Sequence, residues 1–159
     1  MPTTRFRIQA IPRQVYEPFL ELSDLELTHY HARWIVAEAD LEFPCRVSLQ
    51  DAKQGERLLA ISHLHHDSAS PYRAAGPIFV RKNCETARPE IDEVPIMLRH
   101  RLLSLRGYSE DGNMLCAQVV EGSKLEFSIA DQFQFAAVKY QHIHNAMEGC
   151  FNCAVQRIG

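Results

Sequence analysis

Two alternating segments joined by a tight turn place the strongest constraint on how this chain can fold. Residues 102–108 and 113–120 each alternate apolar and polar side chains, which is the pattern of a strand with one buried face. Asp111 and Gly112 lie between these segments, and an Asp-Gly pair between alternating runs favours the turn of a β-hairpin. The sequence therefore predicts an antiparallel pair of strands around which other elements can be placed.

Further segments also carry strand-like sequences. They either alternate or hold short runs of β-branched and aromatic residues bounded by turn residues. They are residues 5–11, 33–40, 57–65, 77–81, 138–144 and 151–158. A turn that starts at Phe43 runs into a short extended piece ending at Leu49.

Three stretches predict helices: residues 15–31, 95–101 and 123–133. The first reads as two pieces, and the second piece begins at Ser23 with Glu26 three residues on, the spacing of a capping box. Pro95 suits the first turn of a short helix. Ser123 and Glu126 repeat the capping spacing before a helix with an apolar stripe.

The predicted helices do not alternate regularly with the predicted strands. This order favours an α+β fold over a doubly wound one. We expect one mostly antiparallel or mixed sheet of six or seven strands, with three or four helices. The chain of 159 residues shows no repeat or linker, so residues 1–159 are expected to form a single globular domain.

Composition excludes several classes of protein. The net charge of −3 argues against nucleic acid as a partner, because proteins that hold a phosphate backbone are normally basic. No window approaches the 18 apolar residues of a membrane span, and the charged start lacks the apolar stretch of a signal peptide. The five cysteines do not form the pattern of a secreted disulfide scaffold. We therefore expect a cytoplasmic protein with reduced thiols.

Familiar catalytic signatures are missing from the sequence. It holds no phosphate-binding glycine-rich loop, no HExxH, no GxSxG and no zinc-finger spacing. The cofactor is unknown from the sequence, as is the oligomeric state. Candidate chemistry is limited to three local clusters of polar residues.

The first cluster is Cys45 followed by Arg46. A guanidinium close to a thiol favours the thiolate, which is the nucleophilic form. Successive strand residues face opposite sides, however, so neighbours in sequence need not meet. An inert buried cysteine beside a structural arginine is the favoured interpretation.

The second cluster surrounds a loop after a strand, at His144, Asn145 and Cys150. A histidine and a cysteine held by one loop are the components of a thiol nucleophile and its base. With His142 and Cys153 they also offer four possible zinc ligands. A structural loop is favoured, a catalytic or ligand-binding loop comes next, and a metal site is third.

The third cluster is the run of three histidines in residues 63–66. A solvated strand end is favoured over a metal site. Tyr72 and Arg73 follow in a turn that would carry them toward the same place. The basic run 99–101 is interpreted as the solvated end of a helix, stabilised by the helix dipole.

Four short pieces, in order, resemble a bacterial family known as domain of unknown function 1203. They are residues 43–46, 70–73, 76–81 and 144–151, the last comprising His144-Asn145-Ala146 and Gly149-Cys150-Phe151. The resemblance implies a single-domain bacterial cytosolic protein with no assigned activity and no known catalytic residues. His142, Cys153 and the run 63–66 lie outside the shared pieces, which weakens the metal and redox-pair interpretations.

Three functional hypotheses remain. The favoured one is a small enzyme acting on a small anionic or carbonyl-bearing metabolite; its catalytic candidates are Cys150, His144, Cys45 and Asn145, and its substrate-binding candidates are Arg46, Tyr72 and Arg73. The alternatives are a non-catalytic module that binds a small ligand or a partner, with structural cysteines, and a metal-binding protein. No residue is assigned to a metal. The enzyme hypothesis requires residues 43–46, 70–73 and 144–151 to wall one shared hollow.

Overall fold

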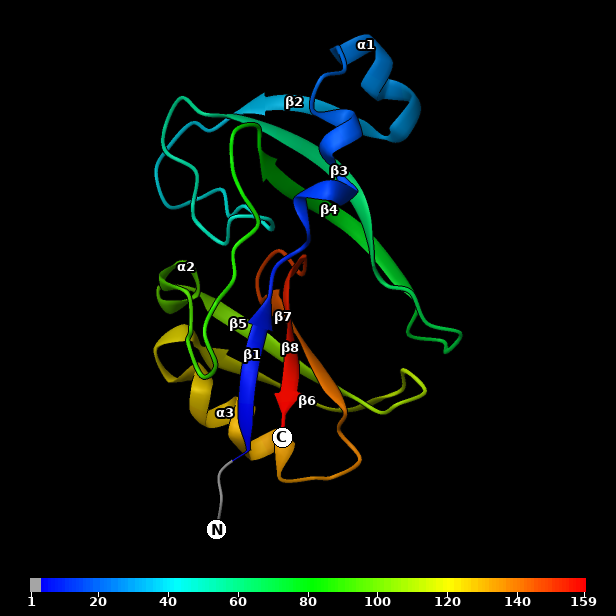
Figure 1. Cartoon of the computed structure of the whole chain (residues 1–159), viewed down its shortest axis with the longest axis vertical. Helices are drawn as coiled ribbons and strands as arrows, with labels where there is room; N and C mark the ends of the chain where they lie inside the picture. Colours follow the sequence, from blue (N-terminus) through cyan, green and yellow to red (C-terminus); the bar gives the residue numbers. More distant parts are fainter. Residues whose placement is uncertain (1–3) are drawn as a thin grey trace.

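The computed structural model describes residues 4–159, and these form two antiparallel sheets (Figure 1). The larger sheet has the strand order β1-β8-β7-β5-β6, with β1 at Arg5–Gln9, β8 at Phe151–Ile158, β7 at Tyr140–Asn145, β5 at Leu102–Tyr108 and β6 at Met114–Glu121. The smaller sheet has the order β2-β3-β4, with β2 at Ala32–Val36, β3 at Arg57–His66 and β4 at Ala74–Arg81. The mixed helix-and-strand class and the antiparallel pairing are confirmed. The expectation of a single sheet is wrong, because the eight strands of the described residues divide into two.

The β5–β6 hairpin is the most accurately predicted element. Leu105 pairs with Gln118 near its middle, and the chain reverses between Ser109 and Asn113. Gly112 has a φ of +82°, and a Cβ at this position would lie 2.1 Å from the Ser68 hydroxyl oxygen. The turn therefore needs glycine both for its backbone conformation and for its contact with a neighbouring loop.

The helices are shorter than the sequence predicts. They are α1 at Asp24–Leu27, α2 at Ile96–Arg99 and α3 at Leu125–Phe133, with 3₁₀ turns at Arg13–Val15, Glu17–Phe19, Thr28–Tyr30 and Gly122–Lys124. The capping box of Ser23 and Glu26 is confirmed at the start of α1. The cap predicted at Ser123 is wrong: that residue lies inside a 3₁₀ turn, and α3 starts without a side-chain cap.

Each sheet has its own apolar core. In the larger sheet, the stripe of α3 packs on the sheet through Leu125, Ile129 and Phe133, all buried. In the smaller sheet, Tyr16 and Leu20, which flank the 3₁₀ turn at Glu17–Phe19, cover the buried face. Alternation in the sequence predicts the strands, but it does not show which of the two cores a strand borders. The division of the strands between two sheets therefore could not be predicted.

The long β3–β4 hairpin reaches from the smaller sheet to the larger one (Figure 1). At its tip the Ser70 hydroxyl donates a 2.7 Å hydrogen bond to the Gly112 carbonyl of the β5–β6 turn. β3 faces β7 and β8 across the space between the sheets, where rings from both sheets are in contact. In the part of the chain that the model describes, no helix is long and apolar enough to cross a membrane.

Candidate functional site

A pocket of about 470 Å³ lies between the segment that contains Arg46 and the turn that joins β7 to β8. Phe43 and Phe79 supply apolar walls. The polar lining includes both signs of charge and two neutral groups, from Arg46, Arg101, Glu42, Glu148, Asn145 and Cys150. We call it the Arg46 pocket. It unites two of the three sequence segments that were expected to share a hollow.

Arg46 is fully buried, yet its side chain borders this pocket. Its Nε donates to the Phe151 carbonyl at 2.8 Å and its Nη1 to the Pro44 carbonyl at 2.6 Å. Its Nη2 donates to the Cys150 Sγ at 3.0 Å. No aspartate or glutamate among residues 4–159 forms an ion pair with it. Burial lowers the pKa of the Arg46 guanidinium, and the neighbouring Cys150 opposes that effect.

Cys150 is half-buried, and its sulfur accepts from two directions. Besides Arg46, the amide of Asn145 donates to the Sγ at 3.4 Å. Asn152 holds that amide in place by donating to the Asn145 Oδ1 at 2.9 Å. A sulfur that faces a guanidinium and an oriented amide accepts hydrogen bonds from both.

His144 does not join this group, although it directly precedes Asn145. Adjacent strand residues point to opposite faces, and here Asn145 faces the pocket while His144 faces the space between the sheets. The His144 Nδ1 lies 2.9 Å from the Gly149 carbonyl, so it carries the proton and donates. Within residues 4–159 no hydrogen bond joins His144 to Cys150. The proposed thiol–imidazole pair of these two residues is therefore not assembled.

The structure places a different histidine at the pocket. His100 lines it, with its Nε2 2.8 Å from an Asp51 carboxylate oxygen. Arg101 binds the same carboxylate through two hydrogen bonds of 2.6 and 3.1 Å. Sequence reasoning missed His100 because it treated residues 99–101 as a solvated helix end. Asp51 lies 49 positions earlier in the chain, so no local pattern could reveal the pair.

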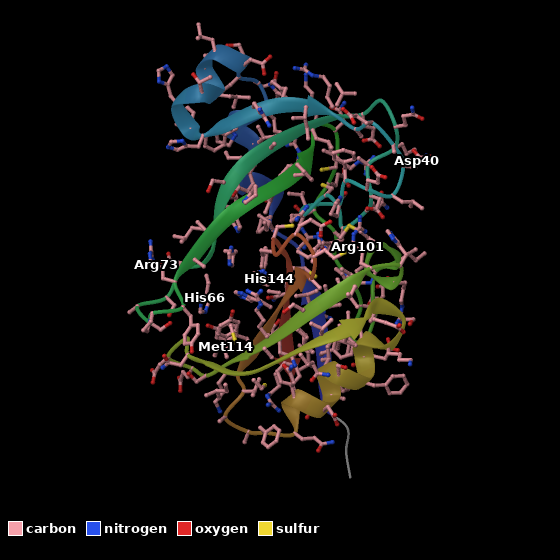
Figure 2. The ribbon with its side chains drawn as sticks, turned by 180° about the vertical axis from the view of Figure 1, so that it is seen from behind. Asp40, His66, Arg73, Arg101, Met114 and His144 are labelled. Atoms are coloured by element: carbon pink, nitrogen blue, oxygen red, sulfur yellow. The ribbon has the colours of Figure 1, made fainter. Side chains whose placement is uncertain are left out.

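The remaining predicted site residues lie elsewhere. Cys45 is fully buried and points toward Cys84, away from its neighbour Arg46. Arg73 forms an ion pair with Asp67 at the tip of the β3–β4 hairpin, and Tyr72 is 43% exposed there. Figure 2 shows Arg73 and Arg101 at opposite sides of the molecule. The segment 70–73 therefore does not wall the Arg46 pocket.

Five histidines meet between the two sheets: His63, His65 and His66 from β3, and His142 and His144 from β7. We call them the histidine cluster, and Figure 2 shows His66 and His144 in this space. The rings of His65 and His144 have centroids 5.0 Å apart. The expectation of a solvated strand end is wrong, because the larger sheet covers this face of β3 and leaves His66 only 3% exposed.

Burial lowers the pKa of four of the five histidines, namely His63, His65, His142 and His144. Desolvation lowers the pKa of His142 to about 3 and the pKa values of His65 and His144 to about 4, and neighbouring positive groups add to the effect. One ring nitrogen of each of these three has no hydrogen-bond partner. No three histidine, cysteine, aspartate or glutamate side chains in the described residues are arranged to hold a metal ion.

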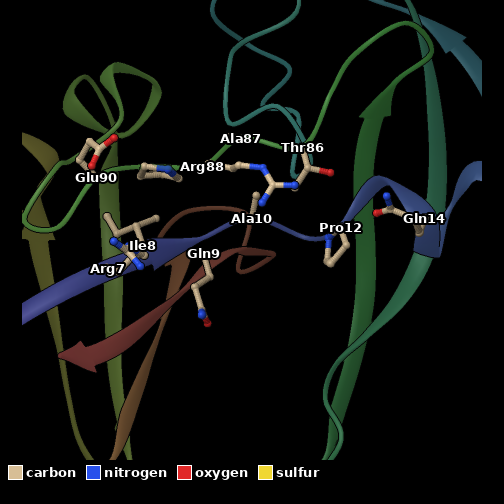
Figure 3. A pocket seen from close by; sticks show the side chains of 11 residues that line it. Arg7, Ile8, Gln9, Ala10, Pro12, Gln14, Thr86, Ala87, Arg88 and Glu90 are labelled. Carbon is tan, nitrogen blue, oxygen red and sulfur yellow. The ribbon is translucent and has the colours of Figure 1, made fainter. Parts of the chain in front are cut away.

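A larger cavity, of about 640 Å³, lies between β1 and residues 86–90 (Figure 3). Its polar lining includes Arg7, Arg88 and Glu90. None of the candidate residues from the sequence borders it, and neither a thiol nor an imidazole does. The Arg46 pocket is therefore the better candidate for a chemical site.

Comparison with known proteins identifies a family but no activity. No protein with a curated description matches this chain, and no solved structure matches it. The model of one family, described as "Protein of unknown function (DUF1203)", matches residues 42–157. The matched region includes Arg46, His100 and Cys150, three of the polar residues that line the Arg46 pocket. Since this region is most of the chain, the protein belongs to the DUF1203 family.

Proposed function

We propose that the Arg46 pocket is the active site of a small enzyme that uses Cys150 as a nucleophile on a small anionic, carbonyl-bearing metabolite. One observation carries the proposal: a fully buried guanidinium without a carboxylate partner donates to a half-buried thiol at 3.0 Å.

The energetics of burial favour a charged sulfur at this position. A buried cation without an opposite charge is costly, because water no longer solvates it. The two carbonyls that accept from Arg46 satisfy its hydrogen bonds but supply only partial negative charge. A Cys150 thiolate would supply a full negative charge at hydrogen-bonding distance and would also be the reactive form of the side chain.

Substrate charge would be recognised by the same guanidinium. Arginine has five N–H donors, and three of those on Arg46 have protein acceptors. The two remaining donors would suit a carboxylate or another small anion, and because Arg46 is fully buried, a neighbouring wall of the pocket has to move for the anion to reach them. The phenyl rings of Phe43 and Phe79 lie in contact along the same pocket, and would pack against the apolar part of a metabolite.

In the reaction, the Cys150 sulfur adds to the carbonyl carbon of the bound metabolite. The new S–C bond forms as the π electrons move to the carbonyl oxygen, and that oxygen then takes one proton. His100 is the proton donor that the pocket offers in its protonated form, and the Asp51 carboxylate orients its ring.

A second function is favoured by one feature of Arg46. Its bonds to the Pro44 and Phe151 carbonyls already lock its position, as in a preformed anion receptor that performs no chemistry. In that case Cys150 would only complete the pocket wall. Small carboxylates would then bind a Cys150→Ser variant as tightly as the wild type.

Thiol alkylation separates the two functions. We expect iodoacetamide at pH 6.5 to alkylate Cys150 at least ~10-fold faster than free cysteine, because a thiolate is the reacting form. Cys116 is the internal control, since it is also partly exposed and burial raises its pKa. Alkylation is followed by mass spectrometry of the separate peptides. A Cys150 rate no higher than that of free cysteine would rule out the enzyme.

A further inference from the structure

A second pair of sulfur atoms lies outside the Arg46 pocket. The Sγ atoms of Cys45 and Cys84 are 3.9 Å apart, although the residues are 39 positions apart in the chain. Cys45 is fully buried, whereas Cys84 is half-buried. In residues 4–159 theirs is the one contact between two cysteine side chains.

The surroundings of Cys45 favour a charged sulfur. The backbone N–H groups of Ser48 and Arg81 donate to its Sγ at 3.4 and 3.3 Å. Burial opposes ionisation of Cys45, but the hydrogen bond from the Cys84 thiol and these N–H groups outweigh it and lower the Cys45 pKa to about 5. The same contact to Cys45 is the main reason why the Cys84 pKa is raised. The pair thus holds one proton fewer than two ordinary thiols at neutral pH.

We propose that Cys45 and Cys84 form a redox pair that closes reversibly to a disulfide by exchange with a small-molecule disulfide such as glutathione disulfide. Cys84 is the accessible partner, so it attacks first: it passes its proton to the neighbouring Cys45 sulfur, a bond to one glutathione sulfur forms, and the glutathione thiolate that leaves takes up that proton. The Cys45 sulfur then attacks the Cys84 sulfur and releases the second glutathione thiolate. In sum, the Cys45 thiolate and the Cys84 thiol are oxidised to one disulfide, and one glutathione disulfide is reduced to one glutathione thiol and one glutathione thiolate, the thiol carrying the single proton that the pair held.

The geometry allows this bond with a small movement. A disulfide needs its sulfur atoms about 2 Å apart, so the gap has to close by roughly 2 Å. Cys84 follows β4 in a stretch without regular secondary structure, and no helix or strand bond holds it. Cys45 is fixed by the fold, since Arg46 next to it donates its backbone N–H to Phe79 at 3.1 Å. The Cys84 side is therefore the one that moves.

The other thiols lack these features. Cys153 is fully buried in the core of the larger sheet. Cys116 lies in β6 and packs against the same core. Cys150 contacts Arg46 and Asn145 rather than another sulfur. Among residues 4–159, none of these three sulfur atoms contacts another sulfur.

The test uses the purified, reduced full chain in glutathione buffers of increasing oxidised fraction. Samples are quenched in acid, free thiols are blocked with N-ethylmaleimide, and the digest is analysed by mass spectrometry. We expect the Cys45 and Cys84 thiols to be lost together as a single cross-linked pair, which dithiothreitol reverses; a glutathione adduct on Cys150 is scored separately, because it reports on the Arg46 pocket and not on this pair. Five blocked thiols at every ratio, a different pair, or a stable glutathione adduct on Cys84 of the wild type would overturn the proposal.

Two cysteine variants add a second test of the same cross-link. Cys84→Ser changes a half-buried side chain and is expected to abolish the cross-link. Cys116→Ser, at another partly exposed cysteine, is the matched control and is expected to cross-link like the wild type. A cross-link that persists in Cys84→Ser would also contradict the assignment. The outcome is independent of the function proposed for the Arg46 pocket, because Cys150 takes no part in it.

Discussion

Arg46 is a permanent positive charge that the fold removes from water. Its three hydrogen bonds tie the segment around Pro44 to the start of β8, so the residue is both a structural anchor and the electrostatic centre of the pocket. Local sequence could point to the residue but not to its partners. Cys150 and Phe151 lie more than 100 positions away, and the neighbouring Cys45 turned out to face elsewhere.

Removing the Arg46 charge should slow the chemistry of Cys150. In Arg46→Gln we expect alkylation of Cys150 by iodoacetamide at pH 6.5 to fall by ~10-fold or more, because the thiolate loses its charged donor. Arg46→Lys keeps the charge and should retain part of the rate. The matched control is Arg73→Gln, which removes a surface arginine paired with Asp67 and should leave the rate unchanged. Equal rates in Arg46→Gln and the wild type would show that Arg46 does not activate the thiol.

The same substitution should also weaken the fold. Arg46→Gln leaves carbonyls of Pro44 and Phe151 buried with fewer donors, and a lost buried hydrogen bond to a charged group costs about 1.5–3 kcal/mol. We expect the free energy of unfolding in urea to fall by roughly 3 kcal/mol. An unchanged midpoint would mean that desolvation of the guanidinium already cancels these bonds.

At the scale of elements, the 3₁₀ turn that precedes α3 packs closely against α2 through the backbone of Gly122. The Gly122 N–H donates to the Arg101 carbonyl at 2.8 Å. A Cβ on Gly122 would lie 1.7 Å from the backbone oxygen of Leu98, which cannot move without displacing α2. The start of α3 is held in place by this contact of Gly122 with α2. It therefore does not depend on a capping side chain from Ser123.

Gly122→Ala should therefore be severely destabilising. We expect a loss of more than about 3 kcal/mol in urea unfolding, or no soluble protein, since overpacking against backbone has no cheap relief. Gly76→Ala is the matched control, because a Cβ there meets nothing within 4 Å, and it should stay within about 0.5 kcal/mol of the wild type. A small loss of stability in Gly122→Ala would show that α2 can move away from the 3₁₀ turn that contains Gly122.

Sequence reasoning succeeded where the signal is local. The β5–β6 hairpin, the capping box of Ser23 and the apolar stripe of α3 depend on residues a few positions apart, and all three are confirmed. It failed where elements distant in sequence meet. Alternation shows which residues of β3 share a face but not what covers that face, so the burial of residues 63–66 could not be foreseen.

For the whole molecule, the contact between the two sheets is built on histidines, and burial lowers the pKa of four of the five. Rings of His65 and Phe151 stack with centroids 5.3 Å apart across this contact. An interface of this composition stays intact only while its imidazoles carry no charge. The stability of the whole chain should therefore depend on pH.

Acid should weaken the fold in a defined window. The pKa values of His65 and His144 are lowered to about 4 and that of His142 to about 3, so the unfolded chain binds more protons than the folded one below its ordinary histidine pKa of about 6.5. Stability is complete above that pH and is lost as pH falls toward 4. Allowing for solvent screening at the half-buried His65, we expect a loss on the order of 3 kcal/mol between pH 6.5 and pH 4.5.

Urea unfolding at several pH values checks this dependence. His142→Gln should flatten the slope, because it removes the most strongly shifted group. His29→Gln, at an exposed position in a 3₁₀ turn, is the control and should keep the wild-type slope. Stability that rises toward pH 4.5 would contradict the neutral interface.

The central claim is that Cys150, whose sulfur accepts a hydrogen bond from Arg46, is the reactive thiol of the Arg46 pocket. The most direct measurement is the ultraviolet absorbance of thiolate at pH 6.5, compared between the wild type and Cys150→Ser, with Cys116→Ser as the control. We predict that Cys150→Ser loses the absorbance of about one thiolate per chain, while Cys116→Ser loses none. Equal absorbance in the wild type and Cys150→Ser would mean that the sulfur is a neutral thiol, and the proposed enzyme would be contradicted.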